Sequence, residues 1–378
     1  MCRCGRMHSI RSMPVAETRL PAHTVWILTA LLSLAGICLS AAATADDATA
    51  VVLLYHHVDD ATPPSTSITP ENFDAHLDYL EREGYSILPL MEIVQALGQS
   101  ETLPPRAVAL TFDDGYSSVY SEALPRLERR GWPFTVFVAT DYIDDGYAGF
   151  MSWTELRDLE TRGGTVANHS TTHAHLIRRA AGEGEADWRM RVRADIEAAQ
   201  TRLDAELDHP LRMLAYPYGE FDSTLEALVA DLGFAAFGQQ SGPVYAPSGM
   251  QQLARFPMAT GFDSLEGLGE KLRTLPLPVT VLAPASRVLG AGSDAPTLEI
   301  RLLDGAYRRD AMRCYVAGQD PARLDWQGDV ATIRAQRPLG PGRSKYNCTA
   351  PSATESGVYY WYSHLWIQPR DNGSWYPD

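Results

Sequence analysis

Residues 108–116 of the chain read VALTFDDGY. The short apolar run Val108–Phe112 predicts a buried strand, and Asp113 and Asp114 follow it directly. Two adjacent carboxylates at a strand end repel each other unless a cation shares the site. Because side chains alternate along the backbone, one carboxylate could bind a metal ion while the other takes a proton from water. An acidic turn without a function is the alternative.

Further strands and helices alternate along the chain from Ala50 to about Pro278. The other predicted strands are Val51–Tyr55, Phe134–Ala139, Val166–Asn168 and Met213–Tyr216. Helices are predicted from Thr69-Pro70 to Gly84, through Leu124 and Leu127 to Gly131, from the capping box of Ser152 and Glu155 to Gly163, over Asp187–Leu207 and over Ser223–Leu232. This alternation predicts an α/β fold in which helices cover a parallel sheet.

Polar or aromatic side chains follow several of the predicted strands. The functional sites of parallel α/β folds gather at the carboxyl ends of the strands. The residues in this position are Tyr55-His56-His57, Asp113-Asp114, His169 and Pro217-Tyr218. We therefore expect them to line one pocket.

The segment from His169 to His173 reads HSTTH. This i, i+4 spacing places both imidazoles on one face of a helical turn, which suits a divalent metal ion. Two histidines and one carboxylate leave coordination positions open for water and a substrate oxygen, as in catalytic sites. The donor set favours Zn²⁺, and Co²⁺ or Ni²⁺ would fit similarly. His175 is offset by six residues from His169, so we expect it to point away from the metal.

Three strings in this order resemble the motifs of a known family: Thr111–Gly115 (TFDDG), His169–His173 (HxxxH) and Tyr216–Gly219 (YPYG). Over about Val51 to Arg273 the chain is similar to the polysaccharide deacetylases of the NodB-homology type, the family four carbohydrate esterases. The resemblance implies a distorted (β/α)7-type barrel. It also implies that Asp113 is the general base and that Asp114, His169 and His173 are the metal ligands. The backbone N–H of Tyr218 would donate to the oxyanion.

The chain departs from the family pattern at two places. Ala215 stands where the third motif usually begins with arginine, and Arg255 could replace that arginine beside Asp113. The late motifs of the family, Asp-x-x-Asp-Trp and Leu-x-His, are missing, so the general acid must come from elsewhere.

The string at residues 55–57, Tyr-His-His, offers this acid. It resembles the permuted arrangement of the biofilm poly-β-1,6-N-acetylglucosamine deacetylases, which implies His56 as the acid. His57 would then point away or line the pocket. The alternative is that either histidine merely caps the strand.

The expected function is the metal-dependent hydrolysis of N-acetyl groups on an N-acetylglucosamine-containing polysaccharide or oligosaccharide. The same machinery would serve a deacetylase of peptidoglycan, chitin oligosaccharides or acetylated xylan. A non-catalytic glycan-binding or export protein with a relict site is a further alternative. The intact set of Asp113, Asp114, His169 and His173 argues against it.

After Pro278 the helix signals disappear. Strands are predicted at Leu298–Leu303, Ala311–Val316, Asp329–Arg334 and Val358–Ile367. We therefore divide the mature chain into a deacetylase domain, residues 46–278, and a small all-β sandwich domain, residues 279–378. Cys314 and Cys348 are expected to form a disulfide in this second domain.

The last predicted strand carries a run of aromatic residues, Tyr359–Tyr362, followed by Trp366. Alternation places Tyr359 and Trp361 on one face of the strand, and the other aromatic residues on the opposite face. One face should belong to the core. The other either packs as well or stacks on sugar rings.

Residues 1–45 have the features of a secretory signal peptide: four arginines, an apolar run from Val25 to Ala42 and an Ala-x-Ala site ending at Ala45. A retained membrane anchor is the alternative, and no later stretch is apolar enough to span a bilayer. Ile37 before Cys38 is a poor signal for lipidation. We therefore expect an exported protein, periplasmic or extracellular.

The net charge of −15 becomes more negative when the arginines of residues 1–45 are removed. A nucleic acid or an anionic membrane is therefore not an expected partner, and a glycan is. The sequence gives no indication of an oligomeric state.

Overall fold

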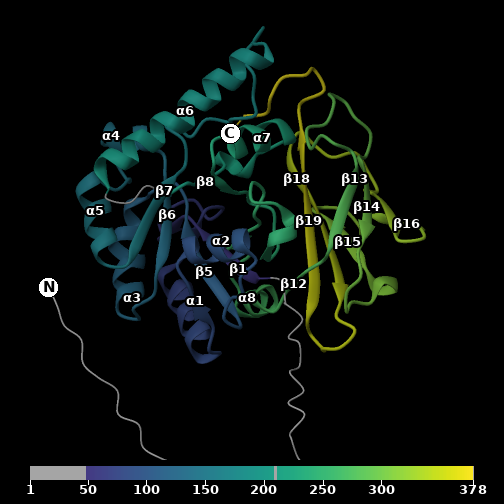
Figure 1. The fold of residues 1–378 in the computed structure, drawn as a ribbon, viewed down its shortest axis with the longest axis horizontal. Helices are drawn as coiled ribbons and strands as arrows, with labels where there is room; N and C mark the ends of the chain where they lie inside the picture. The colour runs from purple at the N-terminus through teal and green to yellow at the C-terminus, as the bar shows by residue number, and fades with distance from the viewer. Residues whose placement is uncertain (1–47, 208–210, 378) are drawn as a thin grey trace, which may run out of the picture. The chain divides into compact units, whose positions relative to one another are not determined.

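The apolar runs of the first half of the chain form one curled sheet in the computed structural model, which describes residues 48–207 and 211–377 (Figure 1). Its parallel strands, in spatial order, are β1 (Thr49–Tyr55), β5 (Ala107–Phe112), β6 (Phe134–Val138), β7 (Gly164–Asn168), β8 (Met213–Ala215) and β9 (Ala235–Phe237). The five strands predicted in this region are confirmed to within two residues at each end. The predicted signal segment, residues 1–45, lies outside the described residues.

Short strands complete the sheet on either side of β1 and β5. The segment after Leu253 spans part of the gap between the first and last parallel strands, because Leu253 forms a bridge with Phe237 and β11 (Phe256–Pro257) pairs with β1. β10 (Val244–Tyr245) runs antiparallel beside the start of β1, and β4 (Ser86–Ile87) lies parallel to β5. The predicted α/β architecture is thus confirmed as a half-barrel of parallel strands with an irregular closure.

The helices of the barrel are α1 (Pro70–Arg82), α2 (Leu90–Gln99), α3 (Leu124–Glu128), α4 (Thr140–Asp144), α5 (Trp153–Thr161), α6 (Glu185–Glu206), α7 (Ser223–Asp231) and α8 (Leu265–Leu272). A π-helical turn, Val119–Ala123, leads into α3. The predicted capping box is present at the start of α5, where Ser152 and Glu155 each accept a hydrogen bond from the other's backbone N–H.

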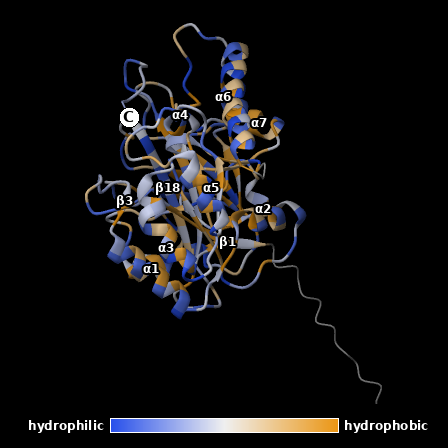
Figure 2. Cartoon of the chain, turned by 90° about the vertical axis from the view of Figure 1, so that its left-hand side faces the viewer, coloured by the Kyte–Doolittle hydropathy of each residue, from blue (hydrophilic) through white to orange (hydrophobic). Residues whose placement is uncertain are grey.

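Side-chain alternation along the strands divides the barrel core into two layers. Leu53 and Leu110 face a cluster shared with α1, α3, α5 and α8, whereas Val52 and Ala109 face a cluster shared with α2. Figure 2 shows hydrophobic residues toward the interior of the barrel and hydrophilic residues on the outer sides of the helices. Among the described residues, no helix is long and apolar enough to cross a membrane.

The second half of the chain adds a sandwich of two four-stranded sheets. One sheet has the order β12 (Leu275–Pro276), β19 (Tyr359–Gln368), β18 (Gly342–Pro351) and β15 (Arg313–Val316). The other has the order β13 (Val279–Ala283), β14 (Thr297–Leu302), β17 (Val330–Arg334) and β16 (Arg323–Gln327). Apolar residues of both sheets form one cluster between them. The predicted sandwich is confirmed, with strands that the sequence did not predict.

A disulfide joins Cys314 and Cys348, as predicted. The two cysteines lie directly opposite each other on the neighbouring strands β15 and β18. The bond therefore links two strands of one sheet inside the sandwich core, where both residues are fully buried.

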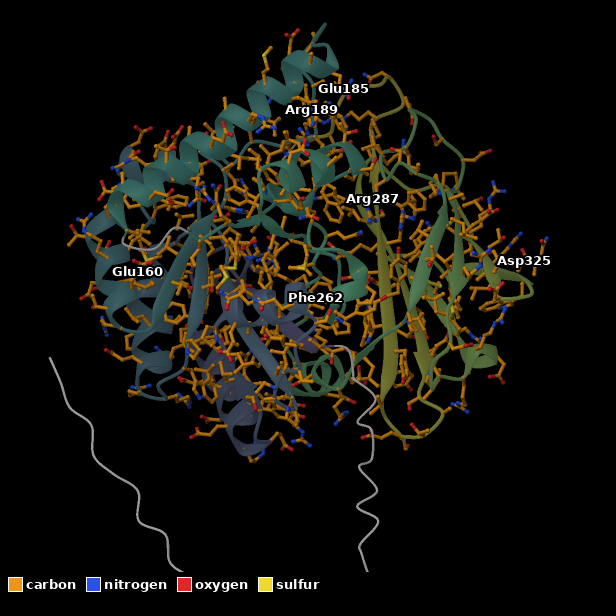
Figure 3. All side chains as sticks on the ribbon, viewed as in Figure 1. Glu160, Glu185, Arg189, Phe262, Arg287 and Asp325 are labelled. Carbon is orange, nitrogen blue, oxygen red and sulfur yellow. A yellow bond between two sulfur atoms is a disulfide. The ribbon has the colours of Figure 1, made fainter. Side chains whose placement is uncertain are left out.

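The aromatic strand β19 is covered on both faces. Trp366 packs in the sandwich core against Tyr346, whereas Trp361 makes an edge-to-face contact with Phe256 of the barrel. Leu365 and Ile367 belong to a cluster that includes β8 and α7 of the barrel. Arg287, labelled in Figure 3, lies at the same junction, over the ring of Phe221. Packing therefore accounts for both faces of this strand over most of its length.

Candidate active site

The predicted site residues follow strand ends at one edge of the barrel. Asp113 and Asp114 follow β5, His169 follows β7, and Tyr218 lies in the turn after β8. Asp113 is tied to the neighbouring strand, because its backbone N–H donates to Tyr55 O at 3.0 Å. The folded chain thus brings together residues that follow different strands in the sequence.

The backbone is strained at this edge. Six non-glycine residues among those described have a left-handed φ, and four of them lie here: Asp114, Ser170, His173 and Tyr218. Such conformations cost about 1–3 kcal/mol each and tend to gather at functional sites. The turns therefore aim these side chains in directions that relaxed loops would not give.

Asp114, His169 and His173 form a cluster of potential metal ligands. Asp114 Oδ1 lies 3.2 Å from the Nε2 atoms of both histidines, and the three ligand atoms lie within 4.8 Å of one another. His169 Nδ1 lies 2.7 Å from Ala215 O. Since a carbonyl oxygen only accepts, Nδ1 carries the hydrogen, and the lone pair of a neutral His169 is left on Nε2.

The donor atoms fit a bound metal ion. Asp114 Oδ1 and His169 Nε2 are buried, and neither makes a well-formed hydrogen bond within the described part of the chain. Buried polar atoms without partners are costly, and a cation between them would satisfy both. Two imidazole nitrogens and one carboxylate oxygen are also a ligand set typical of catalytic zinc. The contacts with both histidines outweigh burial and hold the pKa of Asp114 well below its ordinary value.

Beside this cluster, Asp113 is paired with Arg255. Both side chains are fully buried. Nη1 and Nη2 of the arginine donate to the two carboxylate oxygens at 2.7 and 2.8 Å. Burial alone would raise the pKa of Asp113, but the arginine outweighs it and holds the pKa below its ordinary value. Asp113 therefore stays ionised, in a fixed orientation.

His56 and His57 follow β1 and behave differently. His56 directly follows β1 at this edge, and a charge on its ring lowers the pKa of both Asp113 and Asp114. His57 instead stacks on Tyr116, with ring centroids 3.5 Å apart. Burial and the neighbouring His56 lower the pKa of His57.

His175 was predicted to point away from the metal, and it is absent from the cluster of metal-ligating groups. It is nevertheless buried. Its ring stacks on Tyr218 at 3.7 Å, nearly parallel, and its Nδ1 lies 2.7 Å from Glu220 Oε2. The His175 side chain therefore packs against the Tyr218 turn and stabilises it.

The sequence did not predict a row of aromatic side chains that lies beside the Asp114–His169–His173 cluster. Tyr116 contacts Phe150, which contacts Tyr142, which in turn contacts Tyr147, with centroid separations of 4.8, 4.8 and 5.2 Å. Tyr147 is half exposed. These residues belong to the segments after β5 and β6, with Tyr142 in α4, and share no periodic signal, so only the folded chain brings them together.

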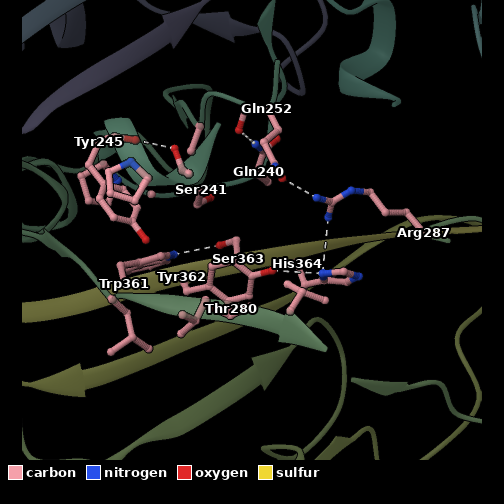
Figure 4. A pocket seen from close by; sticks show the side chains of 18 of the residues that line it. Gln240, Ser241, Tyr245, Gln252, Thr280, Arg287, Trp361, Tyr362, Ser363 and His364 are labelled. Carbon is pink, nitrogen blue, oxygen red and sulfur yellow. Dashed lines mark hydrogen bonds between the residues drawn. The ribbon is translucent and has the colours of Figure 1, made fainter. Parts of the chain in front are cut away.

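A cavity of about 480 Å³ lies at the junction of barrel and sandwich, away from the predicted site (Figure 4). None of the predicted site residues lines it. Its polar groups largely bond one another: Arg287 donates to His364 Nδ1 and to Gln252, and Tyr362 also contacts His364. We therefore do not place the chemistry there.

The chain is similar in sequence to known polysaccharide deacetylases. The sequence model of the polysaccharide deacetylase family matches residues 100–237. A poly-β-1,6-N-acetyl-D-glucosamine N-deacetylase of Escherichia coli is 22% identical over 262 residues, covering 60% of this chain and 38% of the relative. One from Staphylococcus epidermidis is 26% identical over 159 residues, covering 40% and 54%. The chain thus spans about half the length of these relatives or less.

A solved structure, the Streptococcus pyogenes deacetylase PplD in complex with acetate, has the same fold. It superposes with a TM-score of 0.54 at 23% identity, covering 60% of this chain and 99% of the other. At this identity the similarity concerns the fold alone.

Proposed function

Because the chain carries a polysaccharide deacetylase domain, we propose that it is a metal-dependent hydrolase that removes N-acetyl groups from an N-acetylglucosamine-containing polysaccharide or oligosaccharide. The observation that carries this proposal is the juxtaposition of two sites. The Asp114–His169–His173 cluster stands beside a fully buried Asp113–Arg255 pair. A metal site next to an oriented carboxylate is what the hydrolysis of an unreactive amide requires.

Asp114, His169 and His173 would hold the metal ion, for which Zn²⁺ is the first candidate and Co²⁺ or Ni²⁺ are alternatives. Such an ion would polarise the acetamide carbonyl and lower the pKa of a water molecule bound beside it. The hydrogen bond between His169 and Ala215 O fixes the ring that presents Nε2 to the centre.

The remaining steps fall to side chains and backbone groups of the chain itself. Asp113, kept ionised by Arg255, would take a proton from the attacking water. The backbone N–H of Tyr218 would donate to the oxyanion of the tetrahedral intermediate. His56 would give a proton to the departing amine, which leaves poorly without one.

A glycan substrate agrees with the surroundings of the site. The aromatic row from Tyr116 to Tyr147 runs outward from the metal cluster and becomes exposed at its end. Aromatic rings pack against the C–H faces of sugar rings. We propose that this row supports the sugar units next to the one that is deacetylated.

Export of the protein is part of the proposal. It rests on the signal-like residues 1–45 and on the Cys314–Cys348 disulfide, because such bonds persist in oxidising compartments. The division into a deacetylase domain, residues 46–278, and an accessory sandwich, residues 279–378, is proposed in the same way.

The test is acetate release by the purified protein from β-1,6- and β-1,4-linked N-acetylglucosamine oligomers, after chelation and again after zinc is restored. We expect zinc-dependent release that is lost in Asp113→Asn, and the preferred linkage would name the substrate class. No release from either linkage by protein that holds zinc would overturn the glucosamine assignment. Peptidoglycan, acetylated xylan and glycan binding without turnover would then be tested in turn.

A further inference from the structure

Two cationic side chains of β18 reach from the sandwich to the loops that border the site. Arg343 Nη1 donates to Tyr218 O at 2.8 Å, and its guanidinium lies 5.3 Å from the centre of the Tyr218 ring. Lys345 Nζ donates to Gln239 O at 2.8 Å. The two residues are two positions apart, so they project from the same face of the strand. This face belongs to the sandwich but contacts the barrel.

The two loops held in this way touch each other. Tyr218 has a left-handed backbone, with φ 60° and ψ 4°, and Gly219 follows with φ 68°. A Cβ on Gly219 would lie 2.6 Å from the Cβ of Gln239 and 2.8 Å from its backbone nitrogen. A side chain at position 219 is therefore excluded. The Tyr218 turn and the loop after β9 form one packed unit, with each half bonded to β18.

The loop after β9 also holds the arginine of the buried ion pair. Arg255 Nε donates to Gly238 O at 3.0 Å, and its backbone N–H donates to Gln240 O at 3.1 Å. Lys345 binds the carbonyl of Gln239, between these two acceptors. The position of the guanidinium beside Asp113 thus depends on a loop that the sandwich anchors.

A second set of contacts reaches the Tyr218 turn through Glu220, whose Oε1 also lies 4.0 Å from Nε of Arg343. The Tyr376 hydroxyl donates to Glu220 Oε1, and Glu220 Oε2 lies 2.7 Å from His175 Nδ1. His175 in turn stacks under the ring of Tyr218. Glu220 has no exposed side-chain surface. The ring of Tyr218 therefore contacts both a stacked histidine and the guanidinium of Arg343.

From these contacts we propose that β18 is a working part of the deacetylase site, with Arg343 and Lys345 as positioning residues. Arg343 fixes the strained turn that presents the Tyr218 backbone to the substrate, and Lys345 fixes the loop that carries Arg255. The left-handed Tyr218 persists because its surroundings hold it, and Arg343 supplies one of these restraints. This inference rests on the proposed function, since it assigns the two residues to the same reaction.

The first test compares Arg343→Ala and Arg343→Lys with the wild-type protein. The Arg343 side chain is 38% exposed, so its removal leaves no buried cavity. We expect kcat for acetate release to fall by about tenfold in Arg343→Ala while KM changes little, because misplacement of a transition-state donor acts on kcat. Arg343→Lys should recover part of the loss, since an ammonium group can still donate to Tyr218 O. Arg313→Ala, on β15 of the same sheet, is the control, because the exposed Arg313 side chain bonds Met312 O of the sandwich.

The second test is hydrogen–deuterium exchange of the same variants and of Lys345→Met, with folding checked by thermal unfolding. We expect faster exchange in residues 216–220 for Arg343→Ala and in residues 238–240 for Lys345→Met. Unchanged exchange would overturn the proposal, and so would faster exchange with an unchanged kcat. If the wild-type protein releases no acetate, the proposed function fails, and the exchange data alone decide whether β18 holds the loops.

Discussion

Arg255 and Asp113 are 142 residues apart in the sequence, yet they form a two-pronged ion pair in which both side chains are fully buried. A buried pair of this kind gives weak evidence for net stability, because the cost of removing two charges from water offsets their attraction. The main effect of the pair is to orient the carboxylate of Asp113. The two hydrogen bonds fix the plane of the carboxylate that we propose as the general base.

Removing one partner of this ion pair should destabilise the protein. In Arg255→Met the carboxylate of Asp113 remains buried without a partner, which costs about 3–5 kcal/mol. We expect urea unfolding to show a loss of this size, together with a loss of acetate release. The double variant Asp113→Leu/Arg255→Met should recover most of the stability and none of the activity. A single variant as stable as the wild type would contradict the importance of the pair.

Zinc binding should depend on the three clustered side chains. We expect the purified protein to bind one equivalent of zinc by titration calorimetry, and His173→Ala or Asp114→Ala to lower the affinity by at least about tenfold, because each removes a ligand. His57→Ala is the matched control, since His57 lies at the same edge of the barrel but stacks on Tyr116. Equal affinity in His173→Ala would exclude this cluster as the metal site.

The role of His56 can be separated from that of the metal by the choice of leaving group. An amine must be protonated as it leaves, whereas 4-nitrophenolate leaves without a proton. We therefore expect His56→Ala to lower kcat on N-acetylglucosamine oligomers by about 10²–10⁴-fold, the usual range for a general acid. Hydrolysis of 4-nitrophenyl acetate should fall far less, with the zinc content unchanged. Equal losses on both substrates would assign His56 another role.

The sequence has only two lysines, Lys271 and Lys345, and both should affect stability at alkaline pH. Burial lowers the pKa of each from 10.5 to about 8. Between pH 8 and 10.5 the unfolded chain binds more protons than the folded chain. The free energy of unfolding therefore rises with pH in this window, by up to about 1.4 kcal/mol per pH unit for each lysine.

Urea unfolding at pH 8, 8.5 and 9 measures this slope. The series stops at pH 9 because buried tyrosines with a raised pKa, such as Tyr55, act in the opposite direction as the pH approaches 10.0, the ordinary pKa of tyrosine. Lys345→Met should roughly halve the slope, and the variant with both lysines replaced should be nearly flat. A wild-type slope of zero would show that the lysines are well solvated.

The parts of the fold that the sequence predicted are those whose local pattern matches their final environment. Val108–Phe112 and Phe134–Val138 are apolar runs, and they are buried strands. The two-residue strands β4, β10 and β11 have no such pattern, because they exist only through pairing with a neighbour. β18 was missed for a different reason. Its first half carries Arg343 and Lys345, whose charges face the barrel loops.

The site was predictable to a similar extent. Four site residues could be placed together from the sequence. Asp113, Asp114 and His169 follow strands, His173 ends the His-x-x-x-His motif, and parallel strands bring their carboxyl ends to one edge. No local pattern placed Arg343 or Tyr376 near Tyr218. Their positions follow from the packing of the sandwich on the barrel, which depends on contacts between distant segments.

The cluster that joins Leu365, Ile367 and Tyr376 to β8 and α7 also affects the order in which the chain can mature. A ribosome makes β8 about 150 residues before it makes the strand that covers it. During that interval the cluster lacks Leu365, Ile367 and Tyr376, and the apolar surface that these residues cover is open to solvent or to a chaperone. The nascent barrel therefore cannot finish folding until β19 has been synthesised, and a ribosome that stalls before β19 would release a chain prone to aggregation.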